Sequence, residues 1–234
     1  MINKNFKIAI IGPGSMGCLF AGFLTKSGFT VWLIDKKSER VEKIKKNGIY
    51  IKDFKQNFKI KVNITTSIQE IGTCDLIIIC VKSYDTKSAL EKIKKLIKND
   101  TLILTLQNGI GNIEIIKQFI SNEKIITGIT YEASTCLGNG KIKHTGSGET
   151  IISKPQKEII SIFKKSGFKI KTSQNIDSII WSKLVINAAI NPLATITKLH
   201  NGELLKYKET QNILEQVIIE TTKISSKKKY KITL

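Results

Sequence analysis

A lysine and two asparagines stand four residues apart in the stretch "WSKLVINAAINP" (residues 181–192), as Lys183, Asn187 and Asn191. Because an α-helix turns once every 3.6 residues, this spacing puts the three side chains close to one line on its surface. The rest of the stretch is almost wholly apolar, which is typical of a buried helix. The line is therefore either a narrow solvated stripe or a polar line that faces a ligand cleft. Pro192 predicts that the line ends there, because proline removes a backbone donor and disfavours helix at the residue before it.

Glycines follow a second pattern near the N-terminus, where "GPGSMG" has G-x-G-x-x-G spacing after a short apolar run. In a nucleotide-binding turn the first glycine allows the tight bend, the second lets a pyrophosphate approach, and the third lets the helix pack on the strand. The N-terminus of the helix then offers N–H groups to the phosphates. The alternative is a glycine-rich turn of another α/β protein. We expect dinucleotide binding at six residues: Gly12, Pro13, Gly14, Ser15, Met16 and Gly17.

The residues after the second expected strand bear on the choice of cofactor. Asp35 ends that strand, where an acidic residue usually accepts the ribose 2′-OH of NAD. Lys36, Lys37 and Arg40 follow, and these cations could instead bind the 2′-phosphate of NADP. From these residues alone, NAD and NADP remain open.

Two polar residues follow later strands directly. Lys82 and Asn108 each come after an apolar run, and the carboxyl ends of strands in an open parallel sheet carry the ligand. Each has a simpler explanation, as a solvated lysine and an Asn-Gly turn. Together with the glycine loop on the same edge, they favour a site.

The elements that must hold these residues alternate along the chain. Apolar runs predict strands, and periodic segments that end at glycine predict helices. The expected strands cover residues 7–12, 30–35, 75–82, 101–109 and 124–130. The expected helices cover residues 16–27, 38–47, 84–98 and 112–120, with a hairpin within 49–65. This order indicates a parallel sheet with crossover helices.

The pattern changes in the second half of the chain. Residues 131–172 predict short strands with glycine turns, one helix and a last strand, and only helical patterns follow. We therefore expect an α/β fold, with a Rossmann-type dinucleotide-binding domain over residues 1–174 and an all-helical domain over 175–234. A cleft between such domains is a common ligand site, and the line from Lys183 to Asn191 suits it.

Composition excludes several classes of protein. The 234 residues are 41% hydrophobic with a net charge of +19, but the lysines are scattered and Arg40 is the only arginine, so nucleic-acid binding is not the expected main function. No run of about 18 apolar residues and no signal peptide are found, which predicts a cytoplasmic protein without a membrane span. The four cysteines and two histidines lack metal-site spacing, so neither a metal site nor a disulfide is expected.

These motifs together resemble the ketopantoate reductase (2-dehydropantoate 2-reductase) family over essentially the whole chain. "GPGSMG", "DLIIICVKSYD" and "TLQNGIGNIE" are similar to the family's cofactor half, and "KIKHTGSG" to its later strands. "WSKLVINAAINPLATITKLHNGEL" is similar to its most distinctive stretch.

The resemblance implies roles for single residues. Lys183 would be the catalytic general acid, with its pKa lowered by partial burial. Asn187, Asn191 and Asn201 would bind the substrate, a 2-keto acid. Lys82 and Asn108 would contact the cofactor or order the site. The family prefers NADPH and makes pantoate for coenzyme A, so NADP(H) is expected rather than NAD(H), although Asp35 departs from the arginine often found near that position.

A second departure concerns the end of the chain. The family's helical domain continues beyond "SSKKKYKITL", with a serine that binds the substrate carboxylate and a glutamate near the lysine. The expectation is an incomplete helical domain, with two alternatives for its partners: a homodimer, or a missing C-terminal segment supplied in trans. The alternatives are another Rossmann hydroxyacid dehydrogenase and a nucleotide-binding protein that has lost catalysis.

Overall fold

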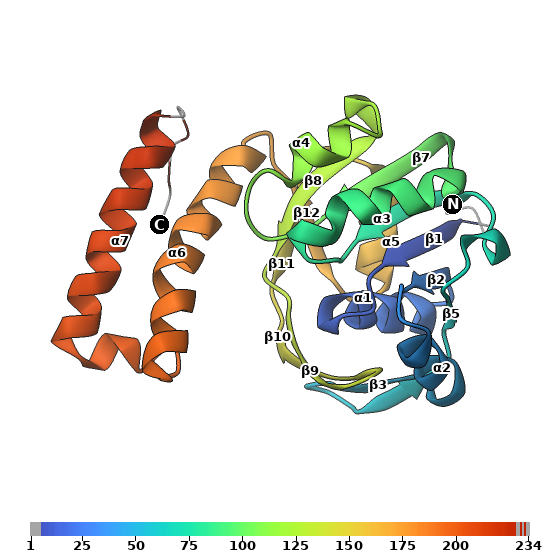
Figure 1. Cartoon of the computed structure of the whole chain (residues 1–234), viewed down its shortest axis with the longest axis horizontal. Helices are drawn as coiled ribbons and strands as arrows, with labels where there is room; N and C mark the ends of the chain where they lie inside the picture. Colours follow the sequence, from blue (N-terminus) through green and yellow to red (C-terminus); the bar gives the residue numbers. More distant parts are fainter. Residues whose placement is uncertain (1–5, 228–229, 231, 233–234) are drawn as a thin grey trace. The chain divides into compact units, whose positions relative to one another are not determined.

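The computed structural model describes residues 6–227, 230 and 232, and the chain divides into two compact units (Figure 1). The first, here called the sheet unit, comprises residues 1–107 and 111–174. The second, here called the helical unit, comprises residues 108–110 and 175–234. Each is described separately below.

An eight-stranded sheet forms the centre of the sheet unit, in the order β12-β11-β8-β7-β6-β1-β2-β5. Its pairs are parallel except for β11 with β8, which is antiparallel. The strands are β1 (Lys7–Ile11), β2 (Thr30–Ile34), β5 (Asn63–Thr65), β6 (Cys74–Ile79), β7 (Ile97–Thr105), β8 (Ile125–Thr130), β11 (Glu149–Ile152) and β12 (Lys169–Thr172). The runs "KIAII" and "CDLIII" are buried on both faces, as expected for central parallel strands. The predicted parallel sheet is confirmed.

A smaller sheet, in the order β4-β3-β10-β9, packs on the other side of helix α1 (Figure 1). Its strands are β3 (Ile49–Lys52), β4 (Phe58–Ile60), β9 (Ala133–Gly138) and β10 (Lys141–Gly146). The predicted hairpin is β3 with β4. Helix α1 (Ser15–Lys26) approaches this sheet closely, since a Cβ atom on Gly22 would lie 2.4 Å from Cδ1 of Ile51.

The remaining helices of the sheet unit are α2 (Ser38–Asn47), α3 (Thr86–Ile93), α4 (Asn112–Lys117) and α5 (Lys157–Lys165). The predicted lysine-rich helix over 84–98 was too long, because the chain enters a short 3-10 turn at Lys94–Leu96 and then β7. Thr101 fixes this early strand: its hydroxyl accepts the N–H of Lys98 at 2.9 Å and donates to the carbonyl of Cys74 at 2.6 Å. Side-chain periodicity does not reveal such a contact.

The helical unit contains α6 (Ile176–Thr197), a 3-10 turn (Leu204–Lys206) and α7 (Lys208–Lys227). A small core of Ala189, Leu193, Leu204 and Leu214 joins them. Helix α6 continues through Pro192, whose ring disfavours helix, to Thr197. The missing proline N–H costs one backbone bond, and the hydroxyl of Thr195 donates to the carbonyl of Asn191 at 2.8 Å.

Helix α6 is also less buried than its apolar sequence predicts. The side chains of Ile186 and Ile196 are 40% and 78% exposed. Among the described residues, α6 is the one helix whose length and mean hydropathy of 1.4 would allow it to cross a membrane, a test that core helices also pass. It carries Asp177 and Lys183 within its length, so composition alone is weak support for a span.

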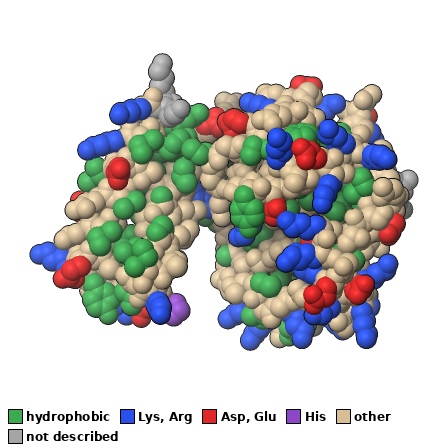
Figure 2. Space-filling model, viewed as in Figure 1, with side chains coloured by type: hydrophobic (Ala, Val, Ile, Leu, Met, Phe, Trp, Pro, Cys, Tyr) green, Lys and Arg blue, Asp and Glu red, His purple; other side chains and the backbone are tan. Residues whose placement is uncertain are grey.

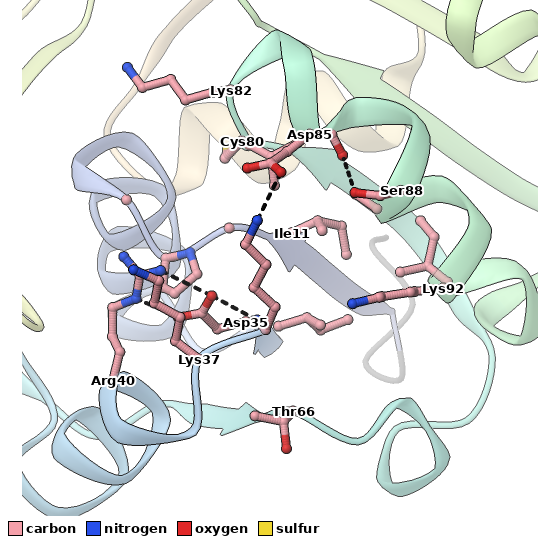
Figure 3. Close-up of a pocket in the computed structure, with 18 of the residues that line it drawn as sticks. Ile11, Asp35, Lys37, Arg40, Thr66, Cys80, Lys82, Asp85, Ser88 and Lys92 are labelled. Atoms are coloured by element: carbon pink, nitrogen blue, oxygen red, sulfur yellow. Dashed lines mark hydrogen bonds and ion pairs between the residues drawn. The ribbon is translucent and has the colours of Figure 1, made fainter.

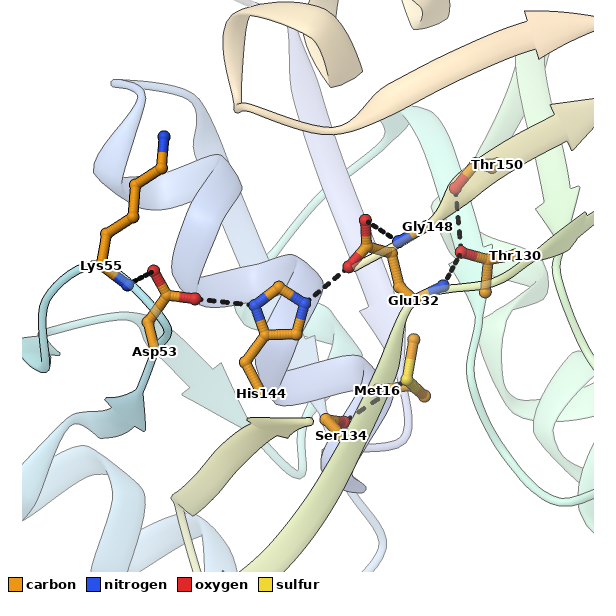
Figure 4. A network of polar contacts seen from close by, with 9 residues as sticks. All are labelled: Met16, Asp53, Lys55, Thr130, Glu132, Ser134, His144, Gly148 and Thr150. Atoms are coloured by element: carbon orange, nitrogen blue, oxygen red, sulfur yellow. Dashed lines mark hydrogen bonds and ion pairs between the residues drawn. The ribbon is translucent and has the colours of Figure 1, made fainter. Parts of the chain in front are cut away.

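A buried network of three titratable side chains joins the small sheet to the end of β8 (Figure 4). Nδ1 of His144 lies 2.7 Å from Oδ1 of Asp53, and its Nε2 lies 2.6 Å from Oε2 of Glu132. The histidine side chain is only 6% exposed. Because both ring nitrogens face carboxylate oxygens, two protons are needed where a neutral imidazole has one N–H. The sequence analysis did not identify this network.

Replacement of this histidine by phenylalanine is expected to destabilise the protein by about 3–5 kcal/mol, because it leaves the buried carboxylate of Glu132 and the partly buried one of Asp53 without their partner. Phenylalanine keeps most of the ring packing on Phe23 and Phe54. Urea unfolding of His144→Phe measures the loss. The control is His200→Phe, at the chain's other, exposed histidine, where a change within about 0.5 kcal/mol is expected. An unchanged stability of His144→Phe would show that the network is not stabilising.

Candidate functional site

The glycine loop joins the end of β1 at Ile11 to the start of α1 at Ser15. Gly12 has φ +98°, a conformation that favours glycine, and its N–H donates to the carbonyl of Ile34 at 2.9 Å. A Cβ atom on Gly17 would lie 2.0 Å from the carbonyl oxygen of Gly12, so the helix and the turn touch there. A Cβ atom on Gly14 would meet nothing within 4 Å. The loop is thus tight on one side and open on the side where a pyrophosphate would approach, so these residues fit a dinucleotide.

A cleft of about 530 Å³ adjoins this loop; we call it the nucleotide cleft (Figure 3). Four segments provide its walls: the loop at Gly12–Gly14, the end of β2 with the start of α2, the chain after β5 at Thr66 and Ile68, and the chain from Cys80 into α3. Its polar and charged lining residues are Asp35, Lys36, Lys37, Arg40, Thr66, Lys82, Tyr84, Asp85, Ser88 and Lys92. The cleft lies at the carboxyl ends of β1, β2 and β6, where ligands bind in open α/β sheets.

Asp35 lies at the bottom of this cleft with only 7% of its surface exposed. Arg40 binds both of its carboxylate oxygens, through Nε to Oδ2 and through a terminal nitrogen to Oδ1 at 3.0 Å (Figure 3). The backbone N–H of Lys36 donates to the same Oδ1 at 2.7 Å. The hydrogen bond that Arg40 donates to Asp35 raises the pKa of Arg40. Both carboxylate oxygens therefore already accept hydrogen bonds, and a ribose 2′-OH would have to share them with Arg40.

Lys36 reaches across the cleft to the opposite wall. Its Nζ lies 2.8 Å from Oδ1 of Asp85, which ends the 3-10 turn after β6. The hydrogen bond that Lys36 donates to Asp85 raises the pKa of Lys36, whose side chain is 55% exposed. Neither Asp85 nor its partnership with Lys36 was expected, because 49 residues separate them in the chain.

Other predicted cofactor residues lie at the edge of this region. Lys82 lines the cleft, three residues beyond the end of β6. Ser15, Met16 and Gly17 form the first turn of α1 and are not among the described lining residues. Asn108 falls in the helical unit by the division of the chain and is described with it.

Gln107, which the sequence analysis did not identify, ties the end of β7 to the segment between β6 and α3. Its Nε2 donates to the carbonyl of Val81 at 2.8 Å and to the hydroxyl of Thr86 at 2.9 Å. Its Oε1 accepts from the hydroxyl of Thr105 at 3.1 Å. The carboxamide thereby holds the segment that carries Lys82.

In the helical unit, Lys183, Asn187 and Asn191 follow one another along α6 as their spacing predicts. Lys183 and Asn187 are partly buried, whereas Asn191 is exposed. Burial lowers the pKa of Lys183 from its ordinary value. Asn201 lies beyond the end of α6 and is exposed. This unit thus holds a lysine whose ammonium is easier to deprotonate than an exposed one, beside a carboxamide.

Two buried thiols offer little reactivity. Burial raises the pKa of Cys18 and of the cleft residue Cys80 to about 12, so both remain protonated at neutral pH. Within the described part of the chain, no group of three or more His, Cys, Asp or Glu residues could hold a metal ion.

A largely parallel sheet with a G-x-G-x-x-G turn and a cleft at the strand ends defines a Rossmann-type dinucleotide-binding protein. Comparison with known families narrows this class. Residues 8–157 match the model described as "Ketopantoate reductase PanE/ApbA", and residues 175–233 match its C-terminal counterpart. The chain belongs to the ketopantoate reductase PanE/ApbA family, whose members are NAD(P)H-dependent oxidoreductases acting on 2-hydroxy and 2-keto acids. The resemblance seen in the sequence is confirmed.

Individual relatives extend this comparison. The chain is 34% identical to a 2-dehydropantoate 2-reductase of Pyrococcus abyssi over 226 residues, which are 94% of this chain and 73% of that protein. It is similar to a ketopantoate reductase of Ralstonia eutropha, with a TM-score of 0.89 and 28% identity over 98% of this chain and 77% of that one. It is equally similar to a D-mandelate dehydrogenase solved with NADH and anilino(oxo)acetate, with a TM-score of 0.91 and 31% identity over 97% and 76% of the two chains.

Figure 2 shows Lys and Arg side chains scattered over the visible face of the sheet unit, without one continuous patch on that face.

Proposed function

We propose that this protein reduces 2-dehydropantoate to pantoate with NADPH, for pantothenate and coenzyme A synthesis in the cytoplasm. The observation that carries the proposal is similarity to reductases of this name over 94% of the chain, at up to 34% identity. The open glycine loop and the partly buried lysine of α6 are the groups that this reaction needs.

The bound nicotinamide supplies the hydride, and the protein supplies binding, orientation and a proton. Negative charge grows on the carbonyl oxygen as the ketone carbon is reduced. Lys183 would stabilise that charge and transfer a proton from Nζ to the oxygen. Its lowered pKa suits this role, because a weaker base gives up its proton more readily. Asn187, Asn191 and Asn201 would hydrogen-bond the substrate and hold the ketone in place, and Asn108 would help to order the site.

The proposed preference for NADPH rests on the charge of the nucleotide cleft. Lys36, Lys37 and Arg40 line it together with two acids: Asp35, whose oxygens are bound by Arg40, and Asp85, which binds Lys36. These three cations suit a 2′-phosphate better than a 2′-hydroxyl, because charge-assisted hydrogen bonds to phosphate are stronger than neutral ones. Binding of the phosphates would involve the loop from Gly12 to Gly17, with Lys82 at the edge.

A second candidate is reduction of a different 2-keto acid. The similarity to D-mandelate dehydrogenase at 31–32% identity favours it, since that enzyme is named for an aromatic 2-hydroxy acid and was solved with NADH. Both candidates use the same chemistry at the ketone, so they differ only in the pocket for the substrate's side chain.

A panel of 2-keto acids with both cofactors tests the proposal. We expect kcat/KM for 2-dehydropantoate with NADPH to exceed that for phenylglyoxylate at least tenfold. The opposite order would favour the mandelate-type reaction. Cofactor binding without turnover of any 2-keto acid would instead identify a nucleotide-binding protein that lacks catalysis.

A further inference from the structure

Two carboxylates already engage two of the cations of the nucleotide cleft. Asp35 binds Arg40 through both of its oxygens, and the Arg40 side chain is 28% exposed. Asp85 binds the ammonium of Lys36 at 2.8 Å from the opposite wall, with 55% and 30% of the two side chains exposed. The two ion pairs differ in one respect. Asp35 and Arg40 lie on the same wall, at the end of β2 and the start of α2, whereas the second pair spans the cleft.

The segment that carries Asp85 is held in place by its own backbone. The N–H of Asp85 donates to the carbonyl of Lys82 at 2.9 Å, and its carbonyl accepts from the hydroxyl of Ser88 at 3.1 Å (Figure 3). Its carboxylate is thus presented from an anchored turn, while Lys36 is a long and flexible side chain. Asp85 therefore determines where the ammonium rests, and not the reverse.

We propose that Asp85 is a specificity-determining residue, which draws Lys36 across the cleft and so weakens the preference for a dinucleotide with a 2′-phosphate. The inference rests on the proposed binding of nicotinamide dinucleotides at this cleft. A 2′-phosphate carries nearly two negative charges and gains from each free cation near the ribose. To bind it, Lys36 must leave Asp85. A 2′-hydroxyl makes no such demand.

Removal of the charge of Asp85 tests this. In Asp85→Asn, we expect the ratio of the Kd for NADH to the Kd for NADPH to rise about three- to tenfold, with the Kd for NADH unchanged within twofold. The size is modest because an exposed ion pair is weak, and the variant also removes a carboxylate that repels the 2′-phosphate. The gain should shrink in high salt, because exposed charges are screened. Calorimetry with both cofactors, and with adenosine 2′,5′-bisphosphate against 5′-AMP, measures it.

The control is Glu149→Gln on β11. It removes one negative charge from an ion pair with Lys171 of β12, and neither residue is in the described lining of the cleft. It should leave the ratio unchanged. A second test repeats Asp85→Asn in a Lys36→Met background, where the gain should disappear because no ammonium is left to release.

The outcomes separate this inference from the function on which it rests. An unchanged ratio in Asp85→Asn, or a gain that persists without Lys36, would overturn the inference while cofactor binding stands. If the wild-type protein binds neither cofactor, the proposed function and the inference fail together.

Discussion

Gly14→Val should abolish dinucleotide binding and leave the fold intact. Gly14 has φ −70° and ψ −173°, an extended conformation that valine adopts without strain. A Cβ atom there meets nothing within 4 Å, so the free protein has room for the side chain. The same space is where a pyrophosphate must approach the backbone. We expect affinity for NADPH and NADH to fall at least about a hundredfold, or nearly 3 kcal/mol.

Fluorescence titration measures the loss, and thermal unfolding shows whether the fold is kept. Gly14→Ala, with a smaller side chain, should lose less affinity for the dinucleotide than Gly14→Val. Gly202→Val is the matched control, since a Cβ atom on Gly202 also meets nothing within 4 Å. Gly17→Ala should behave differently, because its Cβ would lie 2.0 Å from the carbonyl oxygen of Gly12 and would disturb the turn itself. Wild-type affinity in Gly14→Val would mean that the loop does not hold the phosphates.

Local sequence predicted the features that depend on neighbouring residues. The glycine spacing, the strand that precedes it and α2 over Ser38–Asn47 were all predicted from a few adjacent positions. The boundary between α3 and β7 was not, because a hydroxyl bond from Thr101 to a different strand decides it. Pro192 disfavours helix, yet α6 continues through it, because a helix can lose a single backbone hydrogen bond without ending.

The polar contacts of the site were the least predictable part. Asp35 was identified as a cofactor residue from its place at the end of a strand. Its ion pair with Arg40 depends on the side-chain conformation of Arg40, five residues further along the chain. Lys36 with Asp85, and His144 with Asp53, join residues 49 and 91 positions apart. No spacing rule relates such pairs. They follow from the order of strands in the two sheets, which brings distant loops to the same edge.

Lys183→Ala should lower turnover by about a hundredfold to ten-thousandfold, the range for loss of a general acid. Loss of the charge that stabilises the oxyanion acts in the same direction and is worth about 3–4 kcal/mol for one donor. The Kd for NADPH should change little, because the glycine loop and the nucleotide cleft belong to the other unit of the chain. Single-turnover kinetics and calorimetry measure the two quantities separately. Lys206→Ala, at an exposed lysine of the same unit, is the control and should keep full turnover.

The pH dependence of the same residue provides a sharper test, because a merely structural lysine would not produce it. Ketone reduction needs the protonated amine, so the rate should fall as pH rises through the pKa of Lys183. Burial lowers that pKa below the 10.5 of an ordinary lysine, which moves the fall to lower pH. Oxidation of the hydroxy acid needs the neutral amine and should rise through the same pKa. In Lys183→Arg the charge remains but the side chain does not deprotonate. The reduction rate should therefore be low at every pH, without the fall at high pH. If the reduction rate of Lys183→Arg still fell as pH rises, the proton donor would be another residue.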